Sequence, residues 1–270
     1  MSTDVATIAE EYYDSPDADA FYFSVWGGED IHIGLYDDEH RAVRDASVRT
    51  VAAMADLVDR PAGTRVLDLG AGYGGSARYL AKAKGWHVTC LNISEVQNDR
   101  NREMNDEAGL SGLVDVEHGS FEDVPGPADA YDVVWSQDAF LHSGSRTTVL
   151  DEIARVSRPG ADLVFTDPMQ TDSCPDGVLD PILERIHLDS LASPGFYRRE
   201  LGARGFTEVA FLERAHQLRN HYATVREELQ ARDDLPASDE YVERMIEGLG
   251  HWVNGADSGY LTWGILHFKA

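Results

Sequence analysis

The sequence predicts an α/β protein with a seven-stranded, mostly parallel sheet that is covered by helices on both faces. Between residues 61 and 170, apolar strand-like runs alternate with helical patterns, as expected when each strand is followed by a helix that packs on the sheet. The first run, Val66–Leu69, leads into the glycine-rich turn Gly70-Ala-Gly72-Tyr-Gly74-Gly75 and then into a helix. This order is typical of Rossmann-like sheets, and we expect the last strand to run antiparallel.

The segment before the glycine turn is rich in aromatic residues and is expected to form a cap over the site. A helix is predicted over about 40–59, because Val43, Val51 and Val58 recur at helical spacing. Pro61 and Gly63 end this helix and lead into strand 65–69. The aromatic residues of positions 1–36 are Tyr12, Tyr13, Phe21, Tyr22, Phe23, Trp26 and Tyr36.

Strands and helices then alternate along the chain. Ser94 is followed three residues later by Gln97, a capping box that predicts the start of a helix. The turn Arg158-Pro-Gly160 precedes another apolar strand. The expected elements are helix 76–84, strand 87–92, helix 95–108, strand 114–117, strand 131–135, helix 146–157 and strand 162–167.

The region after residue 168 departs from this simple alternation. We expect a loop, a helix near 179–191, the turn Ser193-Pro-Gly195, strand 206–213, helices near 217–232 and 238–252, and a last strand at 259–268. The chain shows no repeat and no linker, so residues 1–270 are interpreted as one domain. Its parts are an N-terminal cap (1–60), a core (61–170), and a cap insertion with the C-terminal strands (171–270).

The net charge of the chain restricts its partners. With 48 acidic and 23 basic side chains, the 270 residues carry a formal charge of −25 at pH 7. Such a surface repels phosphate backbones and anionic membranes, so neither nucleic acid nor a membrane is an expected partner. The acidity fits adaptation to a salty cytoplasm, where ions screen the repulsion, and it fits an ordinary acidic protein equally well.

Several features predict a cytoplasmic protein, either a monomer or a small homo-oligomer. No stretch approaches the roughly 18 apolar residues of a membrane span. The first residues lack the basic and apolar regions of a secretion signal. Cys90 and Cys174 are interpreted as reduced thiols, although their pairing in a disulfide is the alternative.

The glycine turn predicts a nucleotide-like ligand, because it brings backbone N–H groups and a helix N-terminus against the bound molecule. Gly70, Gly72 and Gly75 satisfy the dinucleotide pattern G-x-G-x-x-G. The pattern D/E-x-G-x-G-x-G, typical of S-adenosylmethionine (SAM) methyltransferases, fits equally well from Asp68 to Gly74. A glycine-rich turn that binds nothing is the remaining alternative.

Two observations favour SAM over a dinucleotide. The carboxylate of Asp68 suits the cationic amino group of the methionyl moiety, whereas it offers nothing to a pyrophosphate. The second strand ends in Asn92, about where a nicotinamide enzyme normally places Asp or Glu for the ribose.

Over residues 60–170 the chain resembles class I SAM-dependent methyltransferases, and more specifically the sarcosine/dimethylglycine N-methyltransferases that make the osmoprotectant glycine betaine. The resemblance implies SAM as cofactor, S-adenosylhomocysteine as product and a small-molecule amine as substrate. Phosphoethanolamine and terpenoid methyltransferases and cyclopropane-fatty-acid synthases share the subgroup, and a SAM-binding regulatory protein is the non-enzymatic alternative. The segments that carry the resemblance are Phe21-Tyr22, Trp26-Gly27, His32-Ile-Gly34-Leu-Tyr36, Leu91-Asn-Ile-Ser94, Gly119-Ser-Phe121, Gln137-Asp-Ala-Phe-Leu-His142, Asp167-Pro-Met-Gln170 and Ser193-Pro-Gly-Phe-Tyr197.

The residues expected to bind SAM follow the predicted strands. Relatives place a ribose-binding residue at the position of Asn92, whose alternative role is that of a turn residue. Gln97 could reach the ribose or serve only in the capping box, and Phe121 could flank the adenine or belong to the core. The complete expected set is Asp68, Gly70, Gly72, Gly74, Asn92, Gln97, Ser120, Phe121, Gln137, Tyr22 and Trp26.

Gln137 and His142 are the expected catalytic residues, and no metal is expected. Gln137 and Asp138 end the fourth strand, at the sheet edge that faces the methyl group in methyltransferases. His142 is a hypothetical base or orienting group, since its unperturbed pKa lies near neutrality. A structural histidine is the alternative. The expected reaction is an in-line attack of a free amine on the methyl of SAM, accelerated mainly by alignment.

A methylated amine would use aromatic side chains, because their faces stabilise a desolvated cation by up to about 2 kcal/mol. The alternative for each aromatic residue is packing within the cap. A substrate carboxylate also requires a guanidinium partner, for which Arg198 is chosen, with Arg185, Arg41 and Arg219 left open. The expected substrate contacts are Tyr22, Trp26, Tyr36, Phe140, His142, Tyr197 and Arg198.

Overall fold

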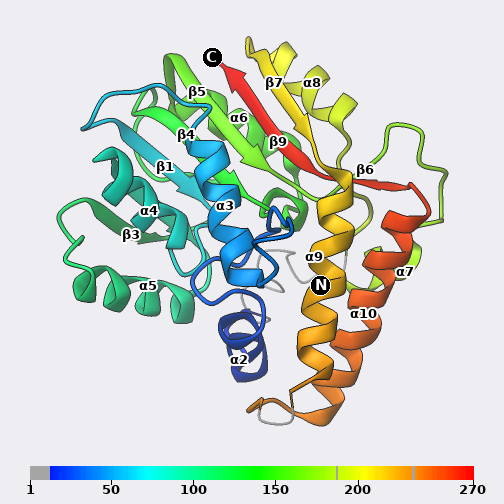
Figure 1. Cartoon of the computed structure of the whole chain (residues 1–270). Helices are drawn as coiled ribbons and strands as arrows, with labels where there is room; N and C mark the ends of the chain where they lie inside the picture. The colour runs from blue at the N-terminus through cyan, green and yellow to red at the C-terminus, as the bar shows by residue number, and fades with distance from the viewer. Residues whose placement is uncertain (1–12, 187, 233–234) are drawn as a thin grey trace, which may run out of the picture.

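One twisted sheet forms the centre of the molecule (Figure 1). The computed structural model describes residues 13–186, 188–232 and 235–270, and the fold is described for these residues. The strands of this sheet are β1 (Arg65–Leu69), β2 (His87–Asn92), β3 (Val114–His118), β4 (Tyr131–Gln137), β5 (Ser157–Thr166), β7 (Thr207–Glu213) and β9 (Gly264–Lys269). A separate pair joins β6 (Met169–Gln170) to β8 (Leu261–Thr262).

The seven strands lie in the order β3-β2-β1-β4-β5-β9-β7. Strands β1 to β5 pair in parallel, whereas β9 runs antiparallel to both of its neighbours, β5 and β7. The predicted seven-stranded, mostly parallel sheet with an antiparallel last strand is therefore confirmed. Since β1 and β4 are neighbours while their chain connections leave in opposite directions, the carboxyl ends of these strands open a crevice.

Helices cover both faces of the sheet, as predicted. One face packs against α3 (Val43–Ala55) and α4 (Gly75–Lys84), and the other packs against α6 (Arg146–Val156) and α8 (Pro194–Ala203). Alternate side chains of a strand serve the two faces, so Trp135 joins the first cluster and Val134 joins the second. A further helix, α5 (Glu95–Glu107), packs against β2 and β3.

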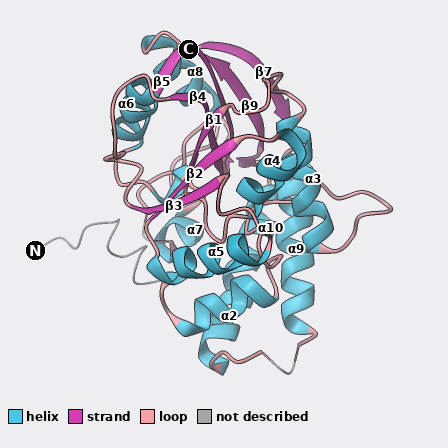
Figure 2. Ribbon diagram, turned by 90° about the vertical axis from the view of Figure 1, so that its left-hand side faces the viewer, coloured by secondary structure: helices cyan, strands magenta, loops and turns pink. Residues whose placement is uncertain are grey.

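A third apolar cluster forms a cap at the carboxyl ends of the parallel strands. It joins α2 (Pro16–Ser24) and the loop that follows it to α7 (Asp180–Arg185), α9 (Ala215–Gln230) and α10 (Asp239–Asp257). Helices α9 and α10 pack side by side (Figure 1), and Figure 2 shows α2, α9 and α10 gathered below the sheet. The N-terminal segment and the insertion before β9 thus meet over the crevice.

The structure corrects several element predictions in the second half of the chain. The helix predicted at 179–191 ends at Arg185, and the turn predicted at 193–195 is the start of α8. Ser193 caps α8, because its Oγ accepts a hydrogen bond from the Phe196 N–H at 3.1 Å, and Pro194 takes the first helical position. The strand predicted at 259–268 is divided at Trp263 into β8 and β9.

The turn predicted at 158–160 is wrong, because β5 already begins at Ser157 rather than at 162, and α10 continues to Asp257 rather than to 252. The remaining predicted elements lie within four residues of those observed. Ser94 Oγ accepts from the Gln97 N–H at 3.2 Å, which confirms the predicted helix start at α5. The short helix α2 was not predicted as a separate element. Tyr12 of the predicted aromatic cap lies outside the described residues. Within the described ranges, no helix combines the length and the apolar character needed to cross a membrane.

Candidate active site

Three adjoining cavities lie between the carboxyl ends of the strands and the cap. The largest, here called the wide cavity, holds about 740 Å³ including its open mouth, a size within the usual range of small-molecule sites. The aromatic cavity holds about 560 Å³ and the acidic cavity about 280 Å³. Ile31 of the cap lines all three, so the cavities adjoin one another.

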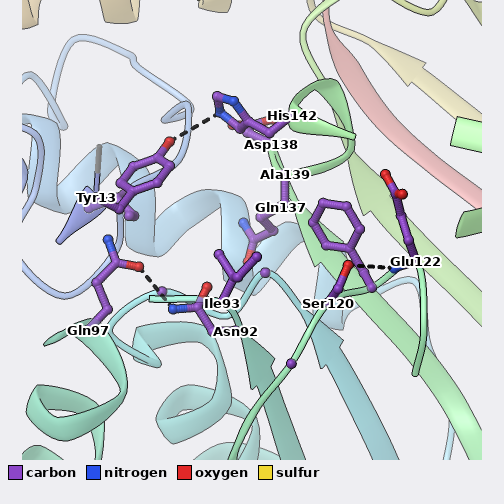
Figure 3. Close-up of a pocket in the computed structure, with 15 residues that line it drawn as sticks. Tyr13, Asn92, Ile93, Gln97, Ser120, Glu122, Gln137, Asp138, Ala139 and His142 are labelled. Atoms are coloured by element: carbon purple, nitrogen blue, oxygen red, sulfur yellow. Dashed lines mark hydrogen bonds between the residues drawn. The ribbon is translucent and has the colours of Figure 1, made fainter. Parts of the chain in front are cut away.

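The wide cavity brings together most of the predicted cofactor residues (Figure 3). Its floor is the glycine turn, in which Gly70 and Gly72 have φ angles of 74° and 54°. A Cβ at Gly70 would lie 2.5 Å from the Cβ of Ala139, so only glycine fits both the conformation and the space. The other predicted residues in its lining are Asn92, Gln97, Ser120, Phe121, Gln137 and His142.

A polar pair marks one side of the wide cavity. The Asn92 Nδ2 donates to the Gln97 Oε1 at 3.0 Å (Figure 3), and both side chains are buried. The Gln97 side chain thus lines the cavity, while the Gln97 backbone N–H donates to the Ser94 side chain that caps the helix. Its buried Nε2 has no hydrogen-bond partner among the described residues, which leaves a donor for a ligand hydroxyl.

The acidic cavity lies beside the start of α4 and is lined by Asp68, Asp30 and His32. Asp68 is 3% exposed, and burial raises the pKa of its carboxyl to about 7, although nearby His32 favours the charged form. The Asp30 Oδ1 is also buried without a hydrogen-bond partner among the described residues. The His32 Nε2 lies 3.4 Å from this oxygen. Two buried carboxylates beside one cavity suit an ammonium group.

Gln137 connects the acidic and wide cavities, since it lines both. Its Oε1 accepts hydrogen bonds from the Ser76 hydroxyl and, at 3.0 Å, from the Trp135 Nε1. Its Nε2 is buried with no partner in the described structure. Gln137 does not line the aromatic cavity, so its geometry suits cofactor binding rather than the predicted catalytic role.

The aromatic cavity lies on the other side, under α2, α7, α9 and α10. The predicted residues Tyr22 and Trp26 line it, and neither lines the wide or the acidic cavity. Tyr222 and Trp252 complete the aromatic wall, with stacked rings whose centroids are 4.8 Å apart. Arg185 supplies the guanidinium that lines this cavity.

Four residues separate the wide cavity from the aromatic cavity: Tyr13, Ile31, Asp138 and His142. The Tyr13 hydroxyl lies 3.1 Å from the His142 Nε2 (Figure 3). Burial, together with the charge of Arg146, lowers the pKa of His142 to about 4. The imidazole is therefore neutral at pH 7, with one ring nitrogen as a donor and the other as an acceptor.

Asp138 holds the cap against the sheet. Its backbone has φ 53°, a strained value for a residue other than glycine. Its carboxylate accepts from the Ile33 N–H at 2.6 Å and from the Trp263 Nε1 at 2.8 Å. Burial raises the pKa of this carboxyl despite these hydrogen bonds. The Asp138 carboxylate thus holds the cap loop and the C-terminal segment together through these two hydrogen bonds.

Several predicted substrate contacts lie outside the cavities. Tyr36 donates to the His221 Nδ1 at 2.8 Å and joins the cap to α9. Phe140 is packed in the core beside Phe165. The buried Tyr197 hydroxyl donates to Asp167 at 2.7 Å. The structure does not support these three predictions, because core and cap packing account for each side chain.

The structure also changes the choice of arginine. Arg198 forms a surface ion pair with Glu208 at 2.6 Å, which corrects its prediction as the substrate guanidinium. Arg41 pairs with Asp38, and Arg219 pairs with Asp257, both at exposed positions. Of the four candidates, Arg185 is the one that lines one of these three cavities.

Sequence reasoning missed four side chains of the site: Tyr13, Asp30, Tyr222 and Trp252. The first was grouped only with the cap aromatics, and Asp30 lies in an irregular loop without a motif. Tyr222 and Trp252 fall at buried positions of long helices, where an aromatic residue normally indicates core. The signal that could have found Asp30 is its place between two segments that carry the family resemblance, Trp26-Gly27 and the segment that begins at His32.

Comparisons with known proteins agree with this geometry. A methyltransferase domain model matches residues 67–165. The chain is 56% identical to a sarcosine/dimethylglycine N-methyltransferase from Aphanothece halophytica, over 98% of this chain and 97% of the relative. The crystal structure of a provisionally assigned sarcosine dimethylglycine methyltransferase from Galdieria sulphuraria superposes with a TM-score of 0.89 at 42% identity, covering 94% of this chain and 98% of that one.

A cyclopropane synthase from Mycobacterium tuberculosis shares the fold alone, with a TM-score of 0.87 at 16% identity over 100% of this chain and 99% of that one. The fold, the glycine turn and the domain match define a SAM-dependent methyltransferase that acts on a small molecule. Given its identity over nearly the whole length of the Aphanothece enzyme, the chain belongs to the family of sarcosine/dimethylglycine N-methyltransferases.

Proposed function

We propose that this enzyme transfers the methyl group of SAM to the nitrogen of sarcosine, dimethylglycine or both, and so makes glycine betaine. The observation that carries the proposal is the aromatic cavity, which adjoins the two cofactor cavities and holds a guanidinium that has no carboxylate partner among the described residues. An amino acid with a methylated nitrogen presents the complementary groups, a carboxylate and a cation. The family relationship points to the same substrates.

SAM fits the site with its adenosine in the wide cavity and its methionyl part in the acidic cavity. Asn92 and Gln97 would bind the ribose hydroxyls, since the first can donate and accept and the second has a free amide N–H. The ammonium of the methionyl part would lie near Asp68 and Asp30. The free Nε2 of Gln137 is a donor suited to the methionyl carboxylate.

The amine substrate would occupy the aromatic cavity. Arg185 can bind a carboxylate through two parallel hydrogen bonds. The buried Nε1 of Trp26 has no acceptor among the described residues and offers a further donor to an anion. Tyr22, Tyr222 and Trp252 line this cavity and would lie near the nitrogen, and the faces of aromatic rings favour a methylated cation.

Positive charge moves from sulfur to nitrogen during the reaction. Asp138 lies at the boundary of the two cavities, where a fixed negative charge stabilises the cation on either side. The aromatic wall would stabilise the positive charge as it develops on the nitrogen, which favours the transition state over the neutral amine. Neutral amine is required for attack, because a protonated amine has no free electron pair.

We assign His142 an orienting role rather than that of the general base. With its pKa lowered to about 4, the imidazole accepts a hydrogen bond at neutral pH but holds a proton poorly. It would therefore align Tyr13 and the amine, while the reactive neutral amine is selected from solution. Most of the acceleration would come from the alignment of donor and acceptor.

A product assay tests the proposal. Purified enzyme is incubated with SAM and, separately, with glycine, sarcosine, dimethylglycine and phosphoethanolamine, and the products are identified by mass spectrometry. We expect dimethylglycine to yield glycine betaine and S-adenosylhomocysteine in equal amounts. Methylation of phosphoethanolamine without methylation of any of the amino acids would overturn the proposal.

A further inference from the structure

Arg185 is one of several arginines that have no ion pair with Asp or Glu in the described part of the chain, and it lines the aromatic cavity. In a protein with 48 acidic and 23 basic side chains, most arginines have an acidic partner close by. The hydrogen bond that Arg185 makes within the described residues runs instead from its Nη2 to the Met245 Sδ, at 2.8 Å. The side chain is half-buried at the aromatic cavity, so its charge is held there without a carboxylate partner among those residues.

A glycine of α10 makes room for this side chain. Gly248 is buried inside the helix and is not among the glycines with positive φ, so no backbone conformation requires glycine there. A Cβ at Gly248 would lie under 3.0 Å from the Nε, Cζ and Cδ atoms of Arg185. Glycine inside a helix lowers stability relative to alanine. The absent side chain is therefore explained by the guanidinium that crosses the helix at this point.

The neighbouring positions of α10 support the same geometry. Met245, Leu249 and Trp252 recur at helical spacing and all line the aromatic cavity, so this face of the helix is turned toward the site. Gly248 lies next to that face, one turn after Met245. The sulfur atom and the glycine thus form a seat for Arg185, which reaches it from α7.

We propose that Gly248 is a positioning residue that seats Arg185 against α10 and so sets the selectivity of the aromatic cavity for amines that carry a carboxylate. This inference rests on the proposed function, since it assigns the carboxylate of the substrate to Arg185. The seat fixes the guanidinium before the substrate arrives, which lowers the entropy cost of binding. An alanine would move the flexible end of Arg185 away, because that end gives way more easily than the helix backbone.

The chain offers a matched control two residues away. Gly250 is also buried inside α10 and has an ordinary φ, but a Cβ there would meet its nearest atom, Arg226 Cζ, at 3.5 Å. This is a normal van der Waals distance. Gly250→Ala therefore makes the same chemical change in the same helix without displacing Arg185.

The experiment compares wild type, Gly248→Ala and Gly250→Ala with two acceptors, dimethylglycine and N,N-dimethylethanolamine, which has no carboxylate. We expect Gly248→Ala to raise the KM for dimethylglycine by about tenfold or more, with a much smaller change in kcat. An increase of this size corresponds to the loss of a hydrogen bond to a charged group. The KM for N,N-dimethylethanolamine should stay near the wild-type value. Gly250→Ala should match wild type with both acceptors.

Binding to the S-adenosylhomocysteine complex, measured by calorimetry with dimethylglycine, checks the same seat without turnover. Gly248→Ala alone should weaken the binding of dimethylglycine. In a protein that already carries Arg185→Gln, the same substitution should weaken binding little further, because the guanidinium is already absent. Thermal unfolding monitors folding of each variant. If Gly248→Ala does not fold, Met245→Leu, which removes the sulfur acceptor at nearly constant volume, should raise the KM for dimethylglycine selectively.

The outcomes separate the two proposals. If the folded Gly248→Ala variant has the same kcat and KM for dimethylglycine as wild type, the proposed role of Gly248 is wrong, while the proposed function stands. Equal KM increases for both acceptors, or an equal loss of binding in the Arg185→Gln background, would overturn the proposed role of Gly248 as well. A wild-type enzyme that methylates none of the carboxylated amines would overturn the proposed function together with the inference.

Discussion

The hydroxyl of Tyr13 lies 3.1 Å from the Nε2 of His142, although 129 positions separate the two residues in the chain. Both line the wide and the aromatic cavities, so this contact stands between the cofactor and the amine. Tyr13 belongs to the segment before α2, and His142 ends the short 3₁₀ helix Phe140–His142 that follows β4. The contact therefore joins the N-terminal cap to the carboxyl edge of the sheet.

Replacing Tyr13 by phenylalanine should lower kcat/KM for dimethylglycine by about 2- to 10-fold, since one hydrogen bond contributes about 0.5–1.5 kcal/mol and the ring is retained. Steady-state kinetics at saturating SAM measure the change. Tyr79→Phe, a change in the partly exposed part of α4, is the control and should be neutral. Equal activity of Tyr13→Phe and wild type would show that the hydroxyl does not orient the reaction.

Removal of the imidazole by His142→Ala should reduce turnover by less than the roughly 10²–10⁴-fold that marks a lost general base. The pH dependence of kcat between pH 6 and 9 should keep its wild-type shape, because the pKa of His142 at about 4 lies below this range. Rates measured across this range provide the check. A larger loss, together with the disappearance of a fall in rate at the acidic end of the profile, would restore His142 as the base.

The affinity for SAM should fall as the pH decreases through 7. The pKa of Asp68 is raised to about 7, so the carboxyl is ionised above this pH and attracts the ammonium of SAM. Below pH 7 it must first lose a proton, which costs about tenfold in affinity for each further pH unit. Calorimetry between pH 6 and 8, in buffers of different ionisation enthalpy, measures both the affinity and the proton release.

Substitutions provide the control for this titration. Asp68→Asn should bind SAM much more weakly and show no proton release near pH 7. Asp115→Asn, at an exposed position of β3, should behave like wild type. Proton release that persists in Asp68→Asn would assign the titration to another group.

The contact between the cap and the glycine turn gives a fourth expectation. A Cβ at Gly75 would lie 2.7 Å from the Glu29 carbonyl oxygen and closer still to the Asp30 carboxylate. Gly75→Ala should therefore displace the cap loop and weaken S-adenosylhomocysteine binding by about tenfold or more. Gly202→Ala, in the open part of α8, is the matched control. Wild-type affinity in Gly75→Ala would mean that the loop adjusts without cost.

The charge of −25 predicts that salt stabilises the protein. Raising the ionic strength from 0.1 to 1 M shortens the screening length from about 10 to about 3 Å and weakens the repulsion among surface carboxylates. The melting temperature should rise over this range of NaCl in differential scanning calorimetry. A steady fall with added NaCl would show that surface ion pairs contribute more than the repulsion costs.

The cofactor side of the site could be predicted from the sequence because its residues follow strands within one continuous stretch. Asn92, Ser120 and Gln137 each come at or just after the end of a strand, and the ends of parallel strands meet at one edge. The glycine turn needs residues that tolerate positive φ angles, and the repeated glycines show this requirement directly in the sequence. These local signals need no knowledge of tertiary packing.

The substrate side depends on packing between distant segments and could not be read in this way. Tyr222 and Trp252 become a cavity wall only when α9 and α10 stack, and before that they resemble core residues. Arg185 could not be chosen over Arg198 from the sequence, because the ion pair that occupies Arg198 is formed with Glu208, which lies on β7. The same limit hid α8, because a serine and a proline that begin a helix resemble those of a turn.

The position of β9 affects how the protein folds during synthesis. This strand lies between β5 and β7, and α9 and α10 are made before it. Until Gly264–Lys269 has left the ribosome, the facing edges of β5 and β7 have no neighbour, and the hairpin of two helices has no finished sheet beneath it. The nascent chain therefore depends on the six residues of β9 to join β7 to the rest of the sheet. Chaperones would be most needed in the interval before that strand emerges.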